Sequence, residues 1–379
     1  MKAPSKAESV ALTLRLKERM VFSLVKVPRI TYENWDMSNT FGRYFRVHSF
    51  GESHGAAMGV VVDGCPAGVL FDGEEIQKDL NRRKPGQASW TSSRNEDEEF
   101  ELLSGVFEGK TLGTPIAIVI KNKDQDSSAY KKIAEGSYRV GHADDLWSKK
   151  YSHVDLRGGG RASGRETVSR VLAGSIAKMF LKQISPELEV TGFTQQIFNL
   201  VLNDSELEQL SSMKSQQIDA FVARLPSERL SQQVEQLLLA AKQEGLSYGG
   251  FAGLQIKGLQ AGLGEPVFYK LKSQLSAAMM SIGASAGVEF ADAFSTCQME
   301  GTAFHSAVQS GRYSGIRGGI SSGETISLKV AFKPTSSVLD VAKKGRHDPC
   351  IIPRAVPVME AMATLVLADL FLAKRLNNV

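Results

Sequence analysis

The chain has 379 residues, of which 42% are hydrophobic and 23% charged, a balance typical of a globular protein and unlike that of a disordered one. Its 45 Lys and Arg residues against 41 Asp and Glu residues leave a net charge of only +4, which does not indicate a nucleic-acid partner. Cys65, Cys297 and Cys350 are far apart and form no C-x-x-C pair, so neither a disulfide framework nor a metal site is expected.

The first 36 residues differ in kind from the rest, because basic residues are interleaved with apolar ones. A targeting leader is one interpretation, but acidic residues at positions 8, 18, 33 and 36 argue against a transit peptide. We therefore interpret residues 1–36 as an N-terminal extension that is disordered or non-native, an upstream addition or the result of an alternative start. Residues 37–379 are predicted to form a single domain.

The first half of this domain is predicted to combine short strands with one helix. The strands are expected over residues 41–50, 58–62, 100–107 and 115–120. Ile76 and Leu80 lie one turn apart in a helix that ends at Pro85. The interval 121–141 is polar and irregular and is predicted to be a loop.

Helical spacing dominates the second half. Apolar residues recur with helical period from Val168 to Phe180, so a helix is predicted to follow Ser163 directly. Further helices are expected over residues 205–217, 227–244, 271–279 and 361–373, and a half-buried strand over 325–332. The apolar stretch 361–373 is shorter than the roughly 20 residues that cross a bilayer, so we expect a core helix and no membrane span. The mixed elements predict an α+β fold.

A Gly- and Arg-rich segment precedes the helix at Ser163. It reads Asp-Leu-Arg-Gly-Gly-Gly-Arg-Ala-Ser-Gly-Arg-Glu over residues 155–166. Glycines allow close approach of backbone N–H groups, a helix start adds positive potential, and arginine forks match phosphate or carboxylate oxygens. The segment favours an anion site, although a loop with solvated charges explains it equally well when taken alone.

Three of the six histidines lie in similar Gly-rich, charged settings. These are His54 in Gly-Glu-Ser-His-Gly, His142 in Gly-His-Ala-Asp and His347 in Gly-Arg-His-Asp-Pro. Histidine is the natural proton donor near neutral pH, and structural hydrogen bonding is the alternative for each. The remaining histidines lack this setting, so we interpret them as structural or exposed: His48, His153 and His305.

Basic residues beside glycine form a second set, which indicates a polyanionic small molecule. Its members are Arg82, Arg83, Lys84, Arg157, Arg161, Arg165 and Arg346. The turn Lys-Pro-Thr-Ser-Ser over residues 333–337 has hydroxyls suited to a phosphate or a ring edge, although ordinary turn chemistry explains it nearly as well. Neither a P-loop nor a Rossmann G-x-G-x-x-G motif is present.

Taken together and in order, eight motifs resemble chorismate synthase over nearly the whole chain from Ser38 onward. They are Gly-Glu-Ser-His-Gly, Asp-Gly-Cys-Pro-Ala-Gly, Arg-Arg-Lys-Pro-Gly-Gln, Gly-His-Ala-Asp, Arg-Gly-Gly-Gly-Arg-Ala-Ser-Gly-Arg-Glu-Thr, Gly-Gly-Ile-Ser-Ser-Gly, Lys-Pro-Thr-Ser-Ser and Gly-Arg-His-Asp-Pro. The resemblance implies one catalytic domain over residues 37–379. Its expected fold is a β-α-β sandwich of antiparallel sheets with helices between them, assembled as a homotetramer.

The resemblance also implies an activity, that of a carbon–oxygen lyase acting on phosphates in aromatic amino acid biosynthesis. The reaction is the anti-1,4-elimination of phosphate from 5-enolpyruvylshikimate 3-phosphate to give chorismate, the last shared step of the shikimate pathway. It requires reduced FMN without net redox change. We expect NADPH to act only indirectly, through an external flavin reductase, and the protein to be cytoplasmic, without metal, nucleic acid or membrane partners.

The motif positions carry the family's roles to particular residues. His54 matches the histidine that protonates reduced flavin, His142 the one that assists the leaving phosphate, and Asp348 the carboxylate that takes a proton from flavin N5. Ser53 and Ser163 are expected to relay protons or position groups. The substrate's anionic groups are assigned to Arg83, Arg165 and Arg346. The flavin is assigned to Arg161, Ala162, Ser163, Gly283, Ala284, Gly318, Lys333, Pro334, Thr335, Ser336, Ser337 and Arg346.

Four positions depart from the usual family pattern. Lys84 replaces a frequent third arginine, Ser89 replaces an arginine, and Val140 replaces a proline; lysine keeps charge but loses the bidentate fork. Ala162 removes one hydroxyl.

Two rival classes of function are compatible with the sequence. One is a flavin oxidoreductase, which the missing Rossmann pattern disfavours. The other is a non-catalytic binder of nucleic acid or acidic ligands, which the near-neutral charge and the His and Asp motifs disfavour.

Overall fold

The computed structural model describes residues 38–91, 98–122, 141–155, 157–306, 310–336, 338–339 and 348–376. Apart from Ser38, all of these belong to one compact unit, Asn39–Val379. The predicted extension over residues 1–36 lies outside the described residues, as does nearly all of the predicted loop over 121–141. Arg346, His347, Ser337 and Val140 also lie outside them.

One five-stranded sheet is built from the first third of the unit, and all of its neighbouring strands are antiparallel. Its strands, in spatial order, are β1 (Thr40–Phe41), β2 (Arg46–Phe50), β3 (Ala57–Asp63), β7 (Ile116–Lys121) and β4 (Phe100–Leu102). A separate two-stranded ribbon joins β5 (Val106–Phe107) to β6 (Lys110–Thr111). The strands predicted over residues 58–62 and 115–120 are confirmed.

The strand predicted over residues 41–50 is wrong as a single element, because a turn separates β1 from β2. A buried carboxylate stabilises that turn: Asp369 Oδ1 accepts hydrogen bonds from the backbone N–H groups of Arg43, Tyr44 and Phe45, at 2.8, 2.6 and 2.9 Å. The strand predicted over residues 100–107 is likewise split. Ser104 in its middle donates to the Pro115 carbonyl and accepts from Ala117 N, so it bonds to the adjoining strand through its side chain.

A second five-stranded antiparallel sheet is built from the later part of the chain. Its spatial order is β11 (Ser285–Phe290), β14 (Ile326–Phe332), β10 (Gly250–Lys257), β8 (Glu189–Ile197) and β9 (Leu200–Val201). Buried and half-buried residues alternate along β14, which confirms the predicted half-buried strand. The hairpin of β12 (Ile316–Arg317) and β13 (Ile320–Ser321) precedes β14.

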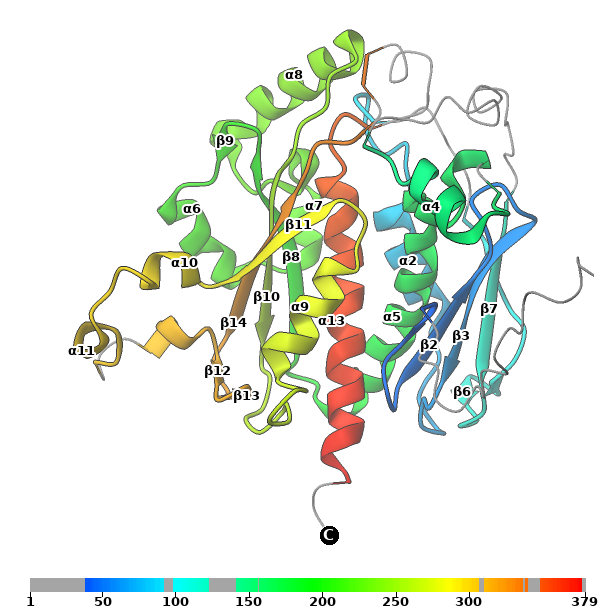
Figure 1. Ribbon diagram of the computed structural model, residues 1–379. Helices are drawn as coiled ribbons and strands as arrows, with labels where there is room; N and C mark the ends of the chain where they lie inside the picture. The colour runs from blue at the N-terminus through cyan, green and yellow to red at the C-terminus, as the bar shows by residue number, and fades with distance from the viewer. Residues whose placement is uncertain are drawn as a thin grey trace, which may run out of the picture. The chain divides into compact units, whose positions relative to one another are not determined.

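Four helices pack on these sheets or on one another. α5 (Thr167–Ile184) packs on β2 and β3 of the first sheet, and α13 (Ile352–Lys374) packs on β8 and β10 of the second, as Figure 1 shows. α2 (Gly73–Arg83) contacts both of these helices, and α9 (Leu271–Met280) contacts α13. α5 and α13 also contact each other, so closely that a Cβ at Gly174 would lie 2.5 Å from Ala361 Cβ.

The remaining helices are short, except for one. They are α4 (Asp144–Tyr151), η2 (Arg157–Ala162), η3 (Gly164–Glu166), α6 (Asp204–Gln209), η4 (Leu210–Ser212), α7 (Ser215–Asp219), η5 (Val222–Arg224), α8 (Glu228–Glu244), α10 (Ala293–Thr296), α11 (Gly301–Phe304) and η6 (Ser310–Tyr313). The helix predicted over 205–217 is wrong as one element, because Met213 and Lys214 adopt extended backbone and Met213 packs against the core. The helices expected at α2, α5, α8 and α9 are confirmed.

By length and composition alone, α13 is long and apolar enough to cross a membrane. Nearly all of it is buried inside the protein, as expected for a core helix, so it is weak evidence for a span. The prediction of a core helix over residues 361–373 is confirmed. With two antiparallel sheets and helices packed on both, the α+β class is confirmed as well.

Candidate active site

The Gly-rich segment of η2 lies against the loop that joins β2 to β3. Gly158 has a φ of +62°, and a Cβ built on it would lie 1.7 Å from His54 Nδ1 and 2.7 Å from Ser53 Oγ. His54 and Ser53 are both buried. Two motifs that are about a hundred residues apart in sequence therefore meet, and glycine is required at their contact.

Asn122, at the end of β7, joins this loop to the first buried arginine. Its side-chain nitrogen donates to the carbonyls of Glu52 (3.1 Å) and Gly55 (2.8 Å). Its side-chain oxygen accepts from Arg165 Nε and Nη2, both at 3.3 Å. The amide thus bridges the His54 loop and the start of α5, where Arg165 is buried.

Glu98 holds two buried arginines on one carboxylate oxygen. Oε1 is bonded by Arg83 Nη2 and by Arg165 Nη1, and the Glu98 side chain is wholly buried. Burial acts to raise the pKa of Glu98, but the charges of Arg83 and Arg165 outweigh it and lower that pKa. For Arg83 burial dominates and lowers the pKa, although the adjacent carboxylate opposes it. Among the described residues, Arg83 Nε is buried without a hydrogen-bond partner.

A second ion pair adjoins this cluster at the start of α13. Arg354 Nη1 lies 2.6 Å from Asp348 Oδ2, and Arg354 Nε donates to the Arg83 carbonyl at 3.2 Å. The Asp348 side chain is only 2% exposed. Nearby Cys350 is also buried, and burial raises the pKa of its thiol to about 12, so it is unsuited to act as a thiolate nucleophile.

The last group lies where β14 ends. Thr335 Oγ1 donates to the Asp348 carbonyl at 3.4 Å, and Lys333 Nζ donates to the Gly141 carbonyl at 3.1 Å. A Cβ at Gly141 would lie 3.7 Å from Ser336 Cβ. The next residue, His142, places Nδ1 2.7 Å from Asp144 Oδ1, and this buried carboxylate orients the ring as in a catalytic triad.

A set of hydrogen bonds and ion pairs therefore connects the loop that carries His54, through Arg165 and Arg83, to Asp348 and to the turn before His142. Most of the predicted site residues lie along it. Ser163 lies beside Arg165, since its Oγ accepts from Arg165 N at 3.3 Å and caps η3. Ala284 lies beside the turn after β14, since its carbonyl accepts from Lys333 N at 3.0 Å.

Some predicted flavin residues are arranged differently. Gly318 lies in the hairpin turn between β12 and β13, before β14 begins, whereas Lys333 directly follows the end of β14. The length of β14, seven residues, therefore separates Gly318 from Lys333 by roughly 20 Å. Arg161 donates to the Gly51 carbonyl, to Asn39 Oδ1 and to Ser49 Oγ, at 3.1, 3.1 and 2.6 Å. This guanidinium thus anchors the loop that carries His54.

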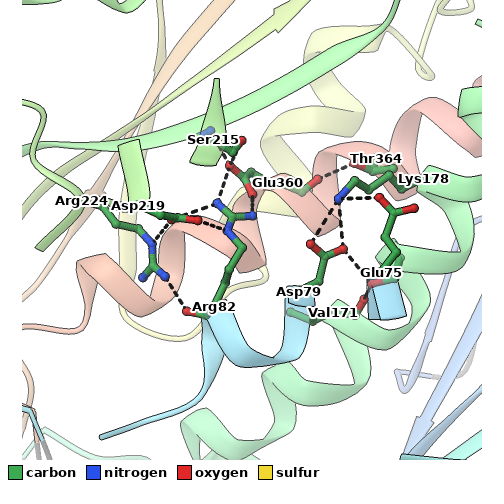
Figure 2. A network of polar contacts seen from close by, with 12 residues as sticks. Glu75, Asp79, Arg82, Val171, Lys178, Ser215, Asp219, Arg224, Glu360 and Thr364 are labelled. Carbon is green, nitrogen blue, oxygen red and sulfur yellow. Dashed lines mark hydrogen bonds and ion pairs between the residues drawn. The ribbon is translucent and has the colours of Figure 1, made fainter. Parts of the chain in front are cut away.

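Adjacent arginines in the Arg82-Arg83-Lys84 motif belong to different networks. Figure 2 shows that Arg82 lies between Asp219 and Glu360, with Arg224 on the far side of Asp219. Arg82 Nε is 2.6 Å from Asp219 Oδ2, and Glu360 Oε1 also accepts from Gly192 N at 2.8 Å. Two cations and two anions balance there, so this network is structural, whereas the neighbouring Arg83 joins the site.

Four residues of the site were not found from the sequence: Glu98, Asn122, Asp155 and Arg354. Glu98 belongs to an acidic run that looks like solvated surface, and Asn122 opens a polar interval with no pattern. Asp155 accepts from Arg157 Nε at 2.9 Å; this hydrogen bond, with a smaller contribution from the charge on His54, lowers the Asp155 pKa. Arg354 carried the one available signal, a lone cation at the start of an apolar helix.

The fold and this cluster define an α+β protein with a buried group of paired arginines and carboxylates, flanked by histidines. The family model of chorismate synthase matches residues 45–372. A chorismate synthase of Bdellovibrio bacteriovorus is 52% identical over 345 residues, covering 90% of this chain and 99% of that protein. One from Christiangramia forsetii is 41% identical over 360 residues, with 90% and 99% covered.

A solved chorismate synthase structure superposes with a TM-score of 0.72 at 29% identity, covering 88% of this chain and 93% of the other. The chain belongs to the chorismate synthase family. It is accordingly an enzyme, a lyase of the shikimate pathway in aromatic amino acid biosynthesis, with a small-molecule substrate.

Proposed function

We propose that the cluster from His54 to His142 is the catalytic site, where 5-enolpyruvylshikimate 3-phosphate loses phosphate to give chorismate with reduced FMN bound. The observation that carries this proposal is the buried Arg83–Glu98–Arg165 group. Arg83 presents a buried Nε–H without an acceptor among the described residues. A buried donor without an acceptor costs about 1–3 kcal/mol, and more when charged, so an anionic ligand would recover that energy.

The charges support a substrate with several anionic groups. Arg83, Arg165 and Arg354 face Glu98 and Asp348, which leaves one more cation than anion in this part of the described structure. Guanidinium groups suit phosphate and carboxylate oxygens because of their paired donors. We assign Arg83 and Arg165 to the substrate's phosphate and carboxylates, and Arg346, outside the described residues, to the same ligand.

The residues around the turn after β14 suit a flavin phosphate and ring edge. Lys333, Thr335 and Ser336 offer an ammonium and two hydroxyls, and a Cβ built on Gly283 would meet no atom within 4 Å, which leaves room for a ring. We propose that these residues hold FMN together with Ala162, Ser163, Ala284, Pro334 and, outside the described residues, Ser337. Reduced FMN, when bound, supplies electron density to the substrate as the phosphate leaves.

The protein's own groups then manage the protons. His142, oriented through Nδ1 by Asp144, donates a proton to the departing phosphate. His54, with Ser53 beside it, serves as the proton donor at the opposite end of the cluster. Asp348 is the proton acceptor, held as a buried carboxylate by Arg354. Ser163 positions Arg165 through the backbone.

Several further properties belong to the same proposal. The helices α5 and α13 between the two sheets would form the β-α-β sandwich of the family, and the protein would act as a homotetramer. Gly318 and Arg161 would contact flavin only after rearrangement or from another subunit. We further propose a single catalytic domain over residues 37–379, a cytoplasmic location, and reduced flavin supplied by an external NADPH-dependent reductase.

An anaerobic assay tests this function. The enzyme is supplied with chemically reduced FMN and 5-enolpyruvylshikimate 3-phosphate, and chorismate is followed by its absorbance. We expect turnover under these conditions and none with oxidised FMN. Absence of product would refute the proposal. Steady turnover with NADPH and FMN, without an added reductase, would refute the external source of reduced flavin alone.

A further inference from the structure

Arg354 occupies a place that helix stability does not explain. It is the third residue of α13, and a helix N-terminus carries partial positive charge, so a cation in the first turn is unfavourable. The rest of that turn is apolar or proline. A residue that violates a local preference is commonly retained for a site, and the contacts of Arg354 indicate which site.

The guanidinium of Arg354 joins two elements of the catalytic cluster. Nη1 lies 2.6 Å from Asp348 Oδ2, and Nε donates to the carbonyl of Arg83 at 3.2 Å. Arg83 is the last residue of α2, where carbonyls lack partners within the helix. The charge of Arg354 also acts on the buried cluster, where it contributes to lowering the pKa values of Arg83 and Glu98.

In the ion pair of Arg354 with Asp348, only the Asp348 side chain is fully buried. The Asp348 side chain is 2% exposed, whereas that of Arg354 is 26% exposed. The surface pair Arg46–Asp63 has the same 2.6 Å separation, but its side chains are 50% and 33% exposed. Water can take over from Arg46 on the surface, but it cannot reach Asp348 in the same way, so the orientation of this carboxylate depends more strongly on its protein partners.

We propose that Arg354 is a positioning residue for catalysis, which fixes the Asp348 carboxylate and ties it to the end of α2 beside Arg83. The inference rests on the proposed function of Asp348 as proton acceptor. Arg354 acts through Asp348 and contacts no reacting atom itself. Removal of Arg354 therefore slows the chemical step through Asp348, with a smaller effect on ligand binding.

A double-mutant cycle tests this proposal. Single-turnover rates are measured with reduced FMN for the wild type, Arg354→Gln, Asp348→Asn and the double variant. We expect Arg354→Gln to slow the wild type by up to about 100-fold, as a misplaced catalytic group does. In the Asp348→Asn background we expect a further loss of roughly twofold or less, because the residue through which Arg354 acts is already gone. Arg354→Lys, which keeps the charge, should recover part of the rate, and Arg46→Gln is the matched surface control.

A second readout needs no turnover. Arg354→Gln should lower the urea midpoint of unfolding in the wild type and much less in Asp348→Asn, because a buried carboxylate loses a charged partner only in the first. The affinity for oxidised FMN, followed by fluorescence quenching, should change by less than about threefold in either background. Equal effects of Arg354→Gln in both backgrounds, or no effect in either, overturn the role of Arg354. A wild-type rate for Asp348→Asn alone instead overturns the proposed function.

Discussion

Gly158 lies directly against the imidazole of His54, and a Cβ at this glycine would lie 1.7 Å from Nδ1. Gly158 also has a φ of +62°, which alanine adopts only with strain. The first glycine of the Gly-Gly-Gly run therefore packs directly against a histidine, and the space that it leaves determines where that imidazole can lie.

We expect Gly158→Ala to slow the chemical step by at least about tenfold, because the added methyl must displace His54. Gly164→Ala in the same segment is the control, since a Cβ there meets no atom within 4 Å. Single-turnover rates and FMN affinity are measured for both variants. Similar rates for the two variants would show that the contact with His54 does not matter for catalysis.

His142→Ala and Asp348→Ala should reduce the rate by a factor of roughly 100 or more, the contribution of a general acid or base. Flavin affinity should change much less. His48→Ala is a suitable comparison, because His48 is exposed and bonds only Thr40 Oγ1, at 2.8 Å, among the described contacts. If rate and flavin affinity fall together, both residues have a structural role instead.

Glu98→Gln should destabilise the protein by about 3–5 kcal/mol, because two buried guanidinium groups lose their shared carboxylate. Added phosphate or substrate should raise the thermal unfolding temperature more in this variant than in the wild type, since an anion then replaces the missing charge. Asp63→Asn removes the surface partner of Arg46 and should cost less than about 1 kcal/mol. Equal stabilisation of Glu98→Gln and wild type by phosphate would argue against an anion site at these arginines.

Arg82→Gln and Arg83→Gln should differ although the residues are adjacent. Arg82 lies in the balanced network of Figure 2, so its loss should lower the unfolding temperature and leave the KM for substrate nearly unchanged. Loss of Arg83 should raise that KM by about tenfold or more, because a charge-assisted contact to the substrate disappears. Steady-state kinetics and calorimetry on both variants check this. A larger KM effect for Arg82 would reverse the assignment.

Glu206 gives a pH-dependent contribution to stability. Burial acts to raise its pKa, but hydrogen bonds from Arg229, Ser227 and the Asn203 N–H lower it to about 2. Because the folded pKa lies below the ordinary value of 4.5, the stabilisation is complete above about pH 4.5 and is lost as the pH falls toward 2. The difference in unfolding free energy between wild type and Glu206→Gln, from urea titrations, should therefore shrink from pH 7 to pH 3. A constant difference would contradict this.

Much of the fold followed from periodicity, because α2, α8, α9 and β14 each bury one regular face. α5 was found from its apolar residues at helical spacing, although it is buried nearly all the way round. The failures have local physical causes. The turn at Arg43 depends on Asp369, which lies more than 300 residues away, and the break at Met213 depends on packing against the core. No short stretch of the sequence contains both members of either contact.

The residues of the candidate site likewise divide into those that the sequence predicted and those that it did not. The motifs around His54, His142, Arg165 and Asp348 could be found because chemistry and glycine occur together in the sequence. Glu98 and Asn122 could not, since a buried carboxylate and a surface carboxylate look identical in a sequence. Their roles depend on which distant arginine lies beside them.

The close approach of Gly174 to Ala361 joins two segments that lie far apart in the sequence. α5 begins two residues after Arg165, and Arg354 lies in the first turn of α13. The two helices touch seven to nine residues further along, about 10 to 14 Å from these two arginines. This contact sets the separation between the segment that carries Arg165 and the segment that carries Asp348. Loss of activity in a natural variant therefore need not mean loss of a polar group, since a single extra methyl between these helices would widen the site from a distance.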